Sequence, residues 1–194
     1  MNQLFQKQSY YKNTFKNIIT SNSTIQNIEF EECLFSKINL TNCKIEKCRF
    51  LNCKFENSVL SAIKPVNSTF NIVMFNECKA LGFDWTLAVK IESLAFSNCQ
   101  IDYSNFRFLY LPNLKLINCV AKEADFTEAD LEGADFTGTD FERSRFFKTN
   151  LPKVNFQKAK NYLIDIKNNN IRKAQFSYPD VLGLLNNLDI KIEY

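Results

Sequence analysis

Seven cysteines are the side chains of this sequence best suited to redox, metal or nucleophilic chemistry, and their spacing is regular. Five have residue numbers that leave a remainder of three on division by five, and the last two leave a remainder of four: Cys33, Cys43, Cys48, Cys53, Cys78, Cys99 and Cys119. No two are spaced as C-x-x-C, and the chain has no histidine. Cysteine–histidine and serine–histidine catalysis and histidine metal sites are therefore excluded. We expect reduced, buried thiols and no cofactor.

Large apolar residues follow the same five-residue period, which matches neither a 3.6-residue helix nor a two-residue strand pattern. Counting every fifth residue, they run from Ile25 to Trp85 in one frame and from Ile91 to Phe156 in a second frame. A smaller residue lies two positions before most of these centres, and the other three positions are mostly polar. Two inward positions in every five predict a chain that turns a corner every five residues. Four sides make a square coil of about 20 residues, and such coils stack about 4.8 Å apart.

Adding twenty to a residue number moves one coil along the predicted rod, so columns of like residues are expected. Three such columns are Phe30–Phe50–Phe70, Phe106–Phe126–Phe146 and Leu111–Leu131–Leu151. Each coil would bury these side chains against the coils on either side, as solenoids require.

Two segments carry a family resemblance: ADFTEADLEGADFTGTDF at 124–141 and CRFLNCKFENSVL at 48–60. They resemble the pentapeptide-repeat proteins, whose pattern is A-(D/N)-(L/F)-x-x, over roughly residues 13–176. The resemblance implies an all-β fold, a right-handed quadrilateral parallel β-helix. Thr20, Asn161 and the run 168–170 depart from the pattern.

The chain is expected to have two parts, a β-helix over residues 1–176 and a cap over 177–194. One extra residue among 86–88 shifts the frame of the β-helix. Either a local bulge absorbs it, or it marks a hinge or partner contact. In the cap, Ser177 and Asp180 suggest the start of a helix, whose apolar face would hold Val181, Leu184, Leu185 and Leu188. Ile190, Ile192 and Tyr194 then alternate as in a strand. This cap would close the end of the rod, form a homodimer contact, or both.

Cysteines also share columns. Cys33 lies one coil from Cys53, and Cys99 one coil from Cys119, so their Cα atoms would be about 4.8 Å apart, within disulfide range. Parallel side chains in a ladder rarely reach the required dihedral angle. We therefore expect free thiols, and no metal site, because metal ligands converge from different directions.

The net charge of +3 hides an acidic coil. Residues 121–142 hold eight acids and one base, whereas residues 143–194 hold ten bases and four acids. Adding twenty pairs Glu123 with Arg143, Asp125 with Arg145, Glu128 with Lys148 and Asp140 with Lys160. Asp130, Glu132 and Asp135 are left least compensated and are the predicted acidic contact. The competing interpretation is structural, because aspartates that precede a centre can bond to the backbone of the turn.

Aromatic side chains at outward positions form a second candidate surface. Tyr103, Phe108, Tyr110 and Phe147 are expected outside the rod, with Arg107 among them. Exposed aromatic residues with arginine are typical of interface hot spots, although scattered exposed apolar residues are also ordinary.

These features favour a non-catalytic protein-binding rod. Resemblance to the quinolone-resistance members of the family implies DNA gyrase or topoisomerase IV as partner, with a homodimer through the C-terminus. Those members carry projecting loops that this sequence lacks. The alternative is a scaffold protein with an unrelated protein partner. We expect no enzyme, no direct binding of nucleic acid, no membrane span and, without an apolar signal segment in MNQLFQKQSYYKN, a cytoplasmic location.

Overall fold

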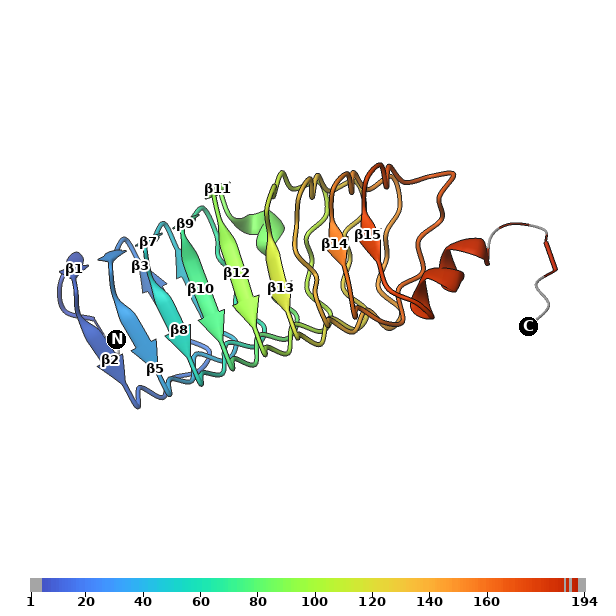
Figure 1. Ribbon diagram of the computed structural model, residues 1–194. Coiled ribbons are helices and arrows are strands. Elements are labelled where there is room, and N and C mark those ends of the chain that lie inside the picture. The colour runs from blue at the N-terminus through green and yellow to red at the C-terminus, as the bar shows by residue number, and fades with distance from the viewer. Residues whose placement is uncertain (1–4, 187, 189, 192–194) are drawn as a thin grey trace.

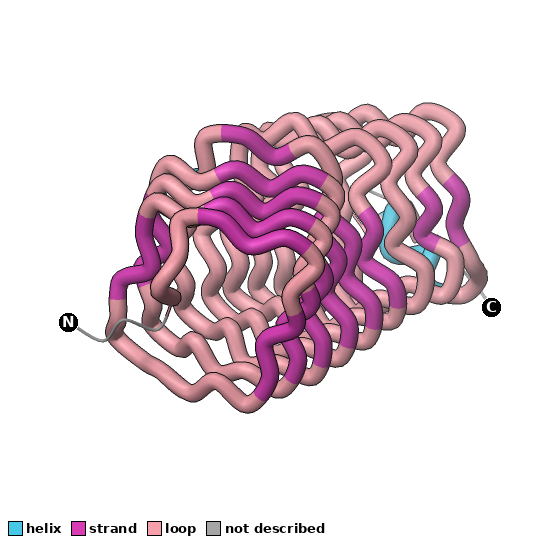
Figure 2. Tube along the Cα trace, turned by 90° about the vertical axis from the view of Figure 1, so that its left-hand side faces the viewer, coloured by secondary structure: helices cyan, strands magenta, loops and turns pink. Residues whose placement is uncertain are grey.

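The computed structural model is a straight rod in which the chain winds as a parallel β-solenoid of about eight turns (Figure 1). It describes residues 5–186, 188, 190 and 191. Viewed nearer the rod axis, the coils lie one behind another and share a four-sided outline (Figure 2). The quadrilateral parallel β-helix expected from the sequence is confirmed. We name its walls after the inward residue of the coil 101–120: the Ile101, Phe106, Leu111 and Leu116 walls, whose four namesakes are buried.

Short strands mark the walls, and every pairing between them is parallel. The Leu116 wall contains a six-stranded sheet and two further strands: β2 (Thr14–Lys16), β5 (Leu34–Ser36), β8 (Lys54–Glu56), β10 (Val73–Asn76), β12 (Leu94–Ser97), β13 (Lys115–Ile117), β14 (Asn155–Phe156) and β15 (Gln175–Phe176). The Leu111 wall contains β1 (Ser9–Tyr11), β4 (Glu29–Glu31), β7 (Arg49–Leu51), β9 (Thr69–Asn71) and β11 (Lys90–Ile91). The Phe106 wall contains β3 (Thr24–Gln26) and β6 (Lys44–Glu46).

Aromatic rings form continuous stacks inside the rod. Phe30, Phe50 and Phe70 are in register in adjacent coils, and their ring centroids are 5.1 Å apart at both steps. The Phe106–Phe126 and Phe126–Phe146 centroids are 5.0 and 5.1 Å apart. The predicted leucine column is also buried. Stacking combined with burial packs each coil against its neighbours along these columns.

The corners of the rod require left-handed backbone. Two residues after nearly every inward centre, φ lies between 50° and 70°, a region that asparagine and glycine tolerate best. Asparagine occupies many of these corners, and glycine occupies 82, 133 and 138. Ile72, Tyr103 and Phe108 adopt the same conformation, which is costly for bulky side chains.

Buried polar residues at the second inward position satisfy backbone groups of neighbouring coils. The Ser68 hydroxyl accepts a hydrogen bond from the Cys48 amide at 3.0 Å and donates to the Ile45 carbonyl at 3.1 Å. Thr139 does the same between the Cys119 amide and the Leu116 carbonyl. The second inward position is therefore suited to cysteine, serine and threonine, which are small and can donate a hydrogen bond to the backbone of a neighbouring coil.

The extra residue lies in a 3₁₀ turn, η1 (Trp85–Leu87). Before it, Lys44 pairs with Lys64, twenty residues on, whereas Asp84 pairs across the turn with Asn105, twenty-one residues on. Beyond the turn the spacing is twenty again, as in the pair Gln100–Val120. The Asp84 carboxylate caps the turn by accepting from the Thr86 amide at 3.2 Å. The Trp85 ring is buried, 5.2 Å from the Phe70 ring. The insertion is thus absorbed without interrupting the aromatic packing, as a local bulge requires.

Further departures from the repeat lie near the C-terminal end of the rod. Phe146 pairs with Ile164, only eighteen residues on, whereas Asn150 pairs with Asn170. Asn169 turns inward, where its amide oxygen accepts from the Thr149 amide at 2.9 Å and its amide nitrogen donates to the Phe146 carbonyl at 3.0 Å. Its side chain replaces the hydroxyl that serves the same position in other coils.

The cap differs from the predicted amphipathic helix. Its helical part is a 3₁₀ helix, η2 (Asp180–Leu185), which begins after Pro179 without a side-chain cap. The predicted capping by Ser177 is wrong, because its hydroxyl instead accepts from the Lys158 amide at 3.0 Å. Leu188 lies beyond the helix, and Ile190 lies outside any strand. Ile192 and Tyr194 fall outside the described residues.

Truncation of one stacked ring tests this packing. Phe126→Ala removes a fully buried side chain and should lower the free energy of unfolding by about 3–5 kcal/mol. Asp130→Ala alters an outward residue and should cost far less. Chemical denaturation of both variants measures the difference. Equal losses would contradict the inward assignment of Phe126.

Candidate protein-interaction surfaces

The described part of the rod has shallow depressions on its outside. They have volumes of about 230 to 480 Å³ and are lined mainly by outward side chains of adjacent coils. Within the described residues, no three cysteine or carboxylate groups lie close enough to hold a metal ion. No helix in that part of the chain has the length and apolarity to cross a bilayer. Candidate sites are therefore surfaces.

The aspartates of the acidic coil stabilise its corners. Asp125, Asp130, Asp135 and Asp140 each use one carboxylate oxygen to accept from the amide two residues on, at 2.9 to 3.2 Å. These are the bonds of Asx turns, which the structural interpretation of the four residues predicts.

Two of the four expected ion pairs are present. Arg143 lies 2.9 Å from Glu123, and Lys160 lies 3.9 Å from Asp140. The predicted pairs Asp125–Arg145 and Glu128–Lys148 are not formed among the described residues. Asp125 instead lies 3.9 Å from Arg107 of the preceding coil, and the Lys148 ammonium lies 5.6 Å from the Phe147 ring centroid.

The predicted acidic contact of Asp130, Glu132 and Asp135 is only partly uncompensated. Glu132 pairs with Lys153 at 2.6 Å, so the expectation that it lacks a cation is wrong. Lys153 lies twenty-one residues on and therefore outside the column rule, at a corner from which its long side chain reaches back. Asp130 and Asp135 accept from the side-chain amides of Asn150 and Asn155 at 3.0 and 3.2 Å. Neither has a cation within ion-pair distance in the described structure.

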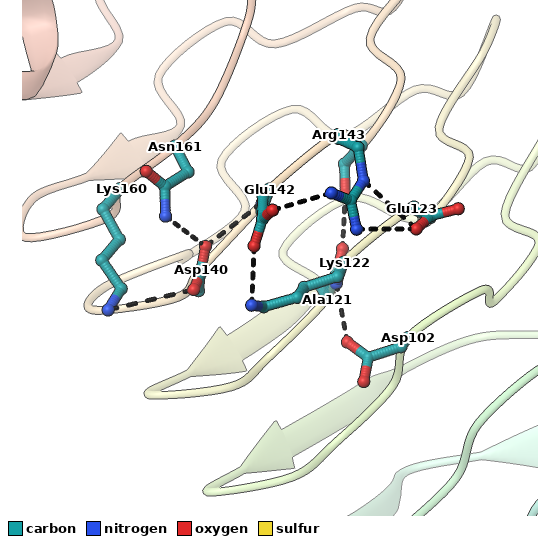
Figure 3. A network of polar contacts seen from close by, with 10 residues as sticks. Asp102, Ala121, Lys122, Glu123, Asp140, Glu142, Arg143, Lys160 and Asn161 are labelled. Carbon is teal, nitrogen blue, oxygen red and sulfur yellow. Dashed lines mark hydrogen bonds and ion pairs between the residues drawn. The ribbon is translucent and has the colours of Figure 1, made fainter.

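Beside them, the Ile101 wall carries a polar network that extends over successive coils (Figure 3). Lys122 contacts Glu142 at 2.6 Å, and Glu142 also contacts Arg143 at 2.9 Å. The Asp102 carboxylate accepts from the Lys122 amide at 2.8 Å. Partial burial raises the pKa of Asp102, whereas the hydrogen bond from Lys122 lowers the pKa of Glu142. Lys122 and Glu142 are also twenty residues apart, so the column rule that gave the other pairs would have found this one.

The aromatic residues Tyr103, Phe108 and Tyr110 are exposed, as expected, with exposed fractions of 60%, 61% and 70%. Tyr103 and Phe108 occupy the two corners that bound the Phe106 wall, whereas Tyr110 projects from the Leu111 wall. The Arg107 guanidinium lies 4.8 Å from the Phe108 ring centroid. These side chains form a band around one coil, bordered by the acidic coil.

The predicted dimer residues of the cap differ in accessibility. Leu184 is buried against the core of the rod, and Val181, Leu185 and Leu188 are half-buried. Ile190 is exposed, and Ile192 lies outside the described residues. Leu184 therefore closes the rod, and a dimer contact through the other residues stays a prediction.

All seven cysteines are free and buried. Each thiol in the stack lies near backbone carbonyls; the Cys53 sulfur, for example, lies 3.2 Å from the Phe30 oxygen. Burial raises the pKa of Cys48 to about 11 and that of Cys53 to about 12. The expectation of free thiols is confirmed, and these groups belong to the core.

Comparison with known proteins accords with this geometry. The model of the pentapeptide repeat region matches residues 28–106 and 89–176, which together span most of the chain. This chain belongs to the pentapeptide-repeat family. No curated protein sequence matches it.

Solved structures of QnrB1, a plasmid-mediated fluoroquinolone resistance protein, have the same fold. One trypsin-treated variant is 16% identical, with a TM-score of 0.68 over 93% of this chain and 100% of that chain. A second trypsin-treated variant is 17% identical, with a TM-score of 0.57 over 96% and 99%. Full-length QnrB1 is 14% identical, with a TM-score of 0.51 over 94% and 100%.

The buried thiols of Cys48 and Cys53 predict a loss of stability in alkali. Their raised pKa values mean that unfolded thiols ionise from about pH 8.5 while folded ones stay neutral, so stability falls from there toward about pH 12. A Cys48→Ser, Cys53→Ser double variant should lose less melting temperature between pH 8 and pH 10.5, because the serine hydroxyl does not ionise in this range. The variant should fold, since serine already fits the equivalent positions 58 and 68. Calorimetry measures both slopes, and other titrating groups cancel in the comparison. Identical slopes would contradict the contribution of these thiols.

Proposed function

We propose that this protein is a non-catalytic rod that binds another protein through its outer walls. The main support for this proposal is that buried side chains fill the interior of the rod. Both inward positions of nearly every repeat are buried, and the aromatic columns leave the chemically varied side chains on the outside. A solenoid of this kind acts through an extended surface.

The partner that we propose is a type II topoisomerase, DNA gyrase or topoisomerase IV. Two features support it: the fold shared with a fluoroquinolone resistance protein, and an acidic coil on a rod of regular cross-section. Asp130 and Asp135 keep one carboxylate oxygen uninvolved in the corner, so two adjacent walls present negative charge at the same level of the rod. Glu132 lies beside them, paired with Lys153 at the exposed surface, where a basic partner could replace that lysine. Carboxylates at such positions would take the place of DNA phosphates on a basic enzyme surface.

Because the acids form one ring and not a long stripe, the proposed contact is confined to one level of the rod. The next coil carries Arg143, Arg145 and Lys148. We therefore infer modulation or protection of the enzyme at micromolar protein, as an agent of fluoroquinolone resistance or toxin immunity, within the cytoplasm.

The second candidate is a scaffold protein with an unrelated protein partner. The exposed band of Tyr103, Phe108 and Tyr110 favours it, since aromatic residues with arginine are enriched in interface hot spots. In either case we retain the prediction that the surface of the cap, with Val181, Leu185 and Ile190, forms a homodimer contact.

Supercoiling by gyrase, with and without ciprofloxacin, tests the topoisomerase proposal. Wild-type protein should inhibit supercoiling or protect it from the drug at micromolar concentration. The variant Asp130→Asn, Glu132→Gln, Asp135→Asn should lose most of this effect, because it removes three charges while asparagine keeps the acceptor that each corner needs.

A matched control is Glu31→Gln, Glu56→Gln, Glu77→Gln, which removes three charges elsewhere on the rod and should leave the effect unchanged. Absence of inhibition and of protection by the wild-type protein would remove topoisomerases as partners. Loss of the effect on substitution of Tyr103, Phe108 or Tyr110, with the acidic variant fully active, would support the scaffold alternative.

A further inference from the structure

The Phe106 wall carries three successive coils of contrasting chemistry. The first presents Tyr103, Arg107 and Phe108, the second presents Glu123, Asp125, Thr127 and Glu128, and the third presents Arg143, Arg145, Phe147 and Lys148. Their stacking follows from the backbone bonds of Tyr103 to Lys122, Phe108 to Thr127 and Glu128 to Phe147. An aromatic row and a cationic row thus lie on either side of an acidic row.

The aromatic row is exposed in spite of its cost. Tyr103 and Phe108 hold φ values of 61° and 62°, at corners where asparagine or glycine would be relaxed. Phe147 is 47% exposed, two coils from Arg107 in the same column. Strained, exposed aromatic side chains at both corners of one wall point to a function of that wall that is separate from folding.

Within one chain the two outer rows cannot pair fully. Coils are about 4.8 Å apart, so Arg107 lies about 9.6 Å from Phe147 along the column, and so does Phe108 from Lys148. Arg107 and Lys148 instead contact the ring of their own sequence neighbour, at 4.8 and 5.6 Å. Phe147 therefore lies out of reach of Arg107, and Phe108 out of reach of Lys148, on the same molecule.

A two-fold axis resolves this mismatch. If the axis lies along the strand direction at the acidic row, a second copy runs antiparallel with its Phe106 wall against the first. Each residue then faces the residue of its own column that lies equally far on the other side of the acidic row. Arg107 faces Phe147, Phe108 faces Lys148 and Tyr103 faces Arg143, and each contact occurs twice. Cation–π contacts of this kind contribute most where water is excluded. We propose that the Phe106 wall is a self-complementary interface whose occupant is a second copy of this chain.

Charge permits this arrangement. The three rows carry four cations, Arg107, Arg143, Arg145 and Lys148, against three anions, Glu123, Asp125 and Glu128. The acidic rows meet at the axis, but the cationic rows of both copies lie on either side of them. Glu123 is already paired with Arg143, and Asp125 lies 3.9 Å from Arg107. Thr127 faces its own copy and separates the carboxylates.

The area indicates a weak dimer. The three coils, by one wall, span about 14 by 16 Å, well below the size of standard stable interfaces. Association in the micromolar range is therefore expected. The proposal goes beyond topoisomerase binding, because it leaves Asp130, Glu132 and Asp135 accessible on the other walls.

Cross-linking at the axis tests the proposal. Thr127→Cys places a thiol directly opposite itself in the dimer, and facing walls about 10 Å apart suit a short bis-maleimide. Thr137→Cys is the matched control, the same residue type in the same coil on the opposite wall. All seven native thiols are buried and give little background. At tens of micromolar protein, Thr127→Cys should yield covalent dimer as its main product and Thr137→Cys should stay monomeric.

Phe108→Asn in the Thr127→Cys background provides a second test, in which stability and dimer formation should change in opposite directions. It relieves the strained corner and should raise the melting temperature, yet it removes two cation–π contacts and should reduce the cross-linked fraction several-fold. Cross-linking that is equal for the two cysteine variants would overturn the proposal. So would a dimer in sedimentation velocity that Thr127→Cys fails to trap, a result that would favour the cap as the interface.

Discussion

The structure depends on one constraint, that the backbone must turn a corner every five residues and still place each inward side chain directly over its counterpart. Left-handed residues make the corner, and parallel hydrogen bonds between coils hold the register. Once both are satisfied, like residues stack without further adjustment, and rings such as Phe106 and Phe126 lie nearly parallel at 2°. Because each coil contacts only its neighbours, stability is close to a sum of local terms.

The core could be predicted from the sequence because its signal recurs in every repeat. The columns of Phe30, Phe106 and Leu111 follow from counting by twenty, and free cysteines follow from their place in those columns. The corners also have a sequence pattern, which a count of apolar residues alone does not reveal. Asparagine recurs two positions after the centres, at 17, 22, 27, 42, 52, 57 and 67, where φ is positive.

Surface contacts were predicted less well, since long side chains are not bound to their column. Lys153 reaches Glu132 across one corner, and Arg107 reaches Asp125 from the preceding coil. The cap failed for a different reason. The Ser177 hydroxyl has two possible partners, and an amide of the last full coil, that of Lys158, is the one within reach. Only the folded rod determines that choice.

The 3₁₀ turn at Trp85 has a broader meaning for how such a rod can change in evolution. The neighbouring coil sets the register. Every residue after the turn therefore has a number one higher than the repeat would give it, but it keeps its place in the stack. A corner is thus a place where the chain can lengthen while the stack on both sides stays intact. Projecting segments could be inserted at a corner and leave the buried contacts unchanged. The displayed surface could then diversify in evolution while the scaffold is retained.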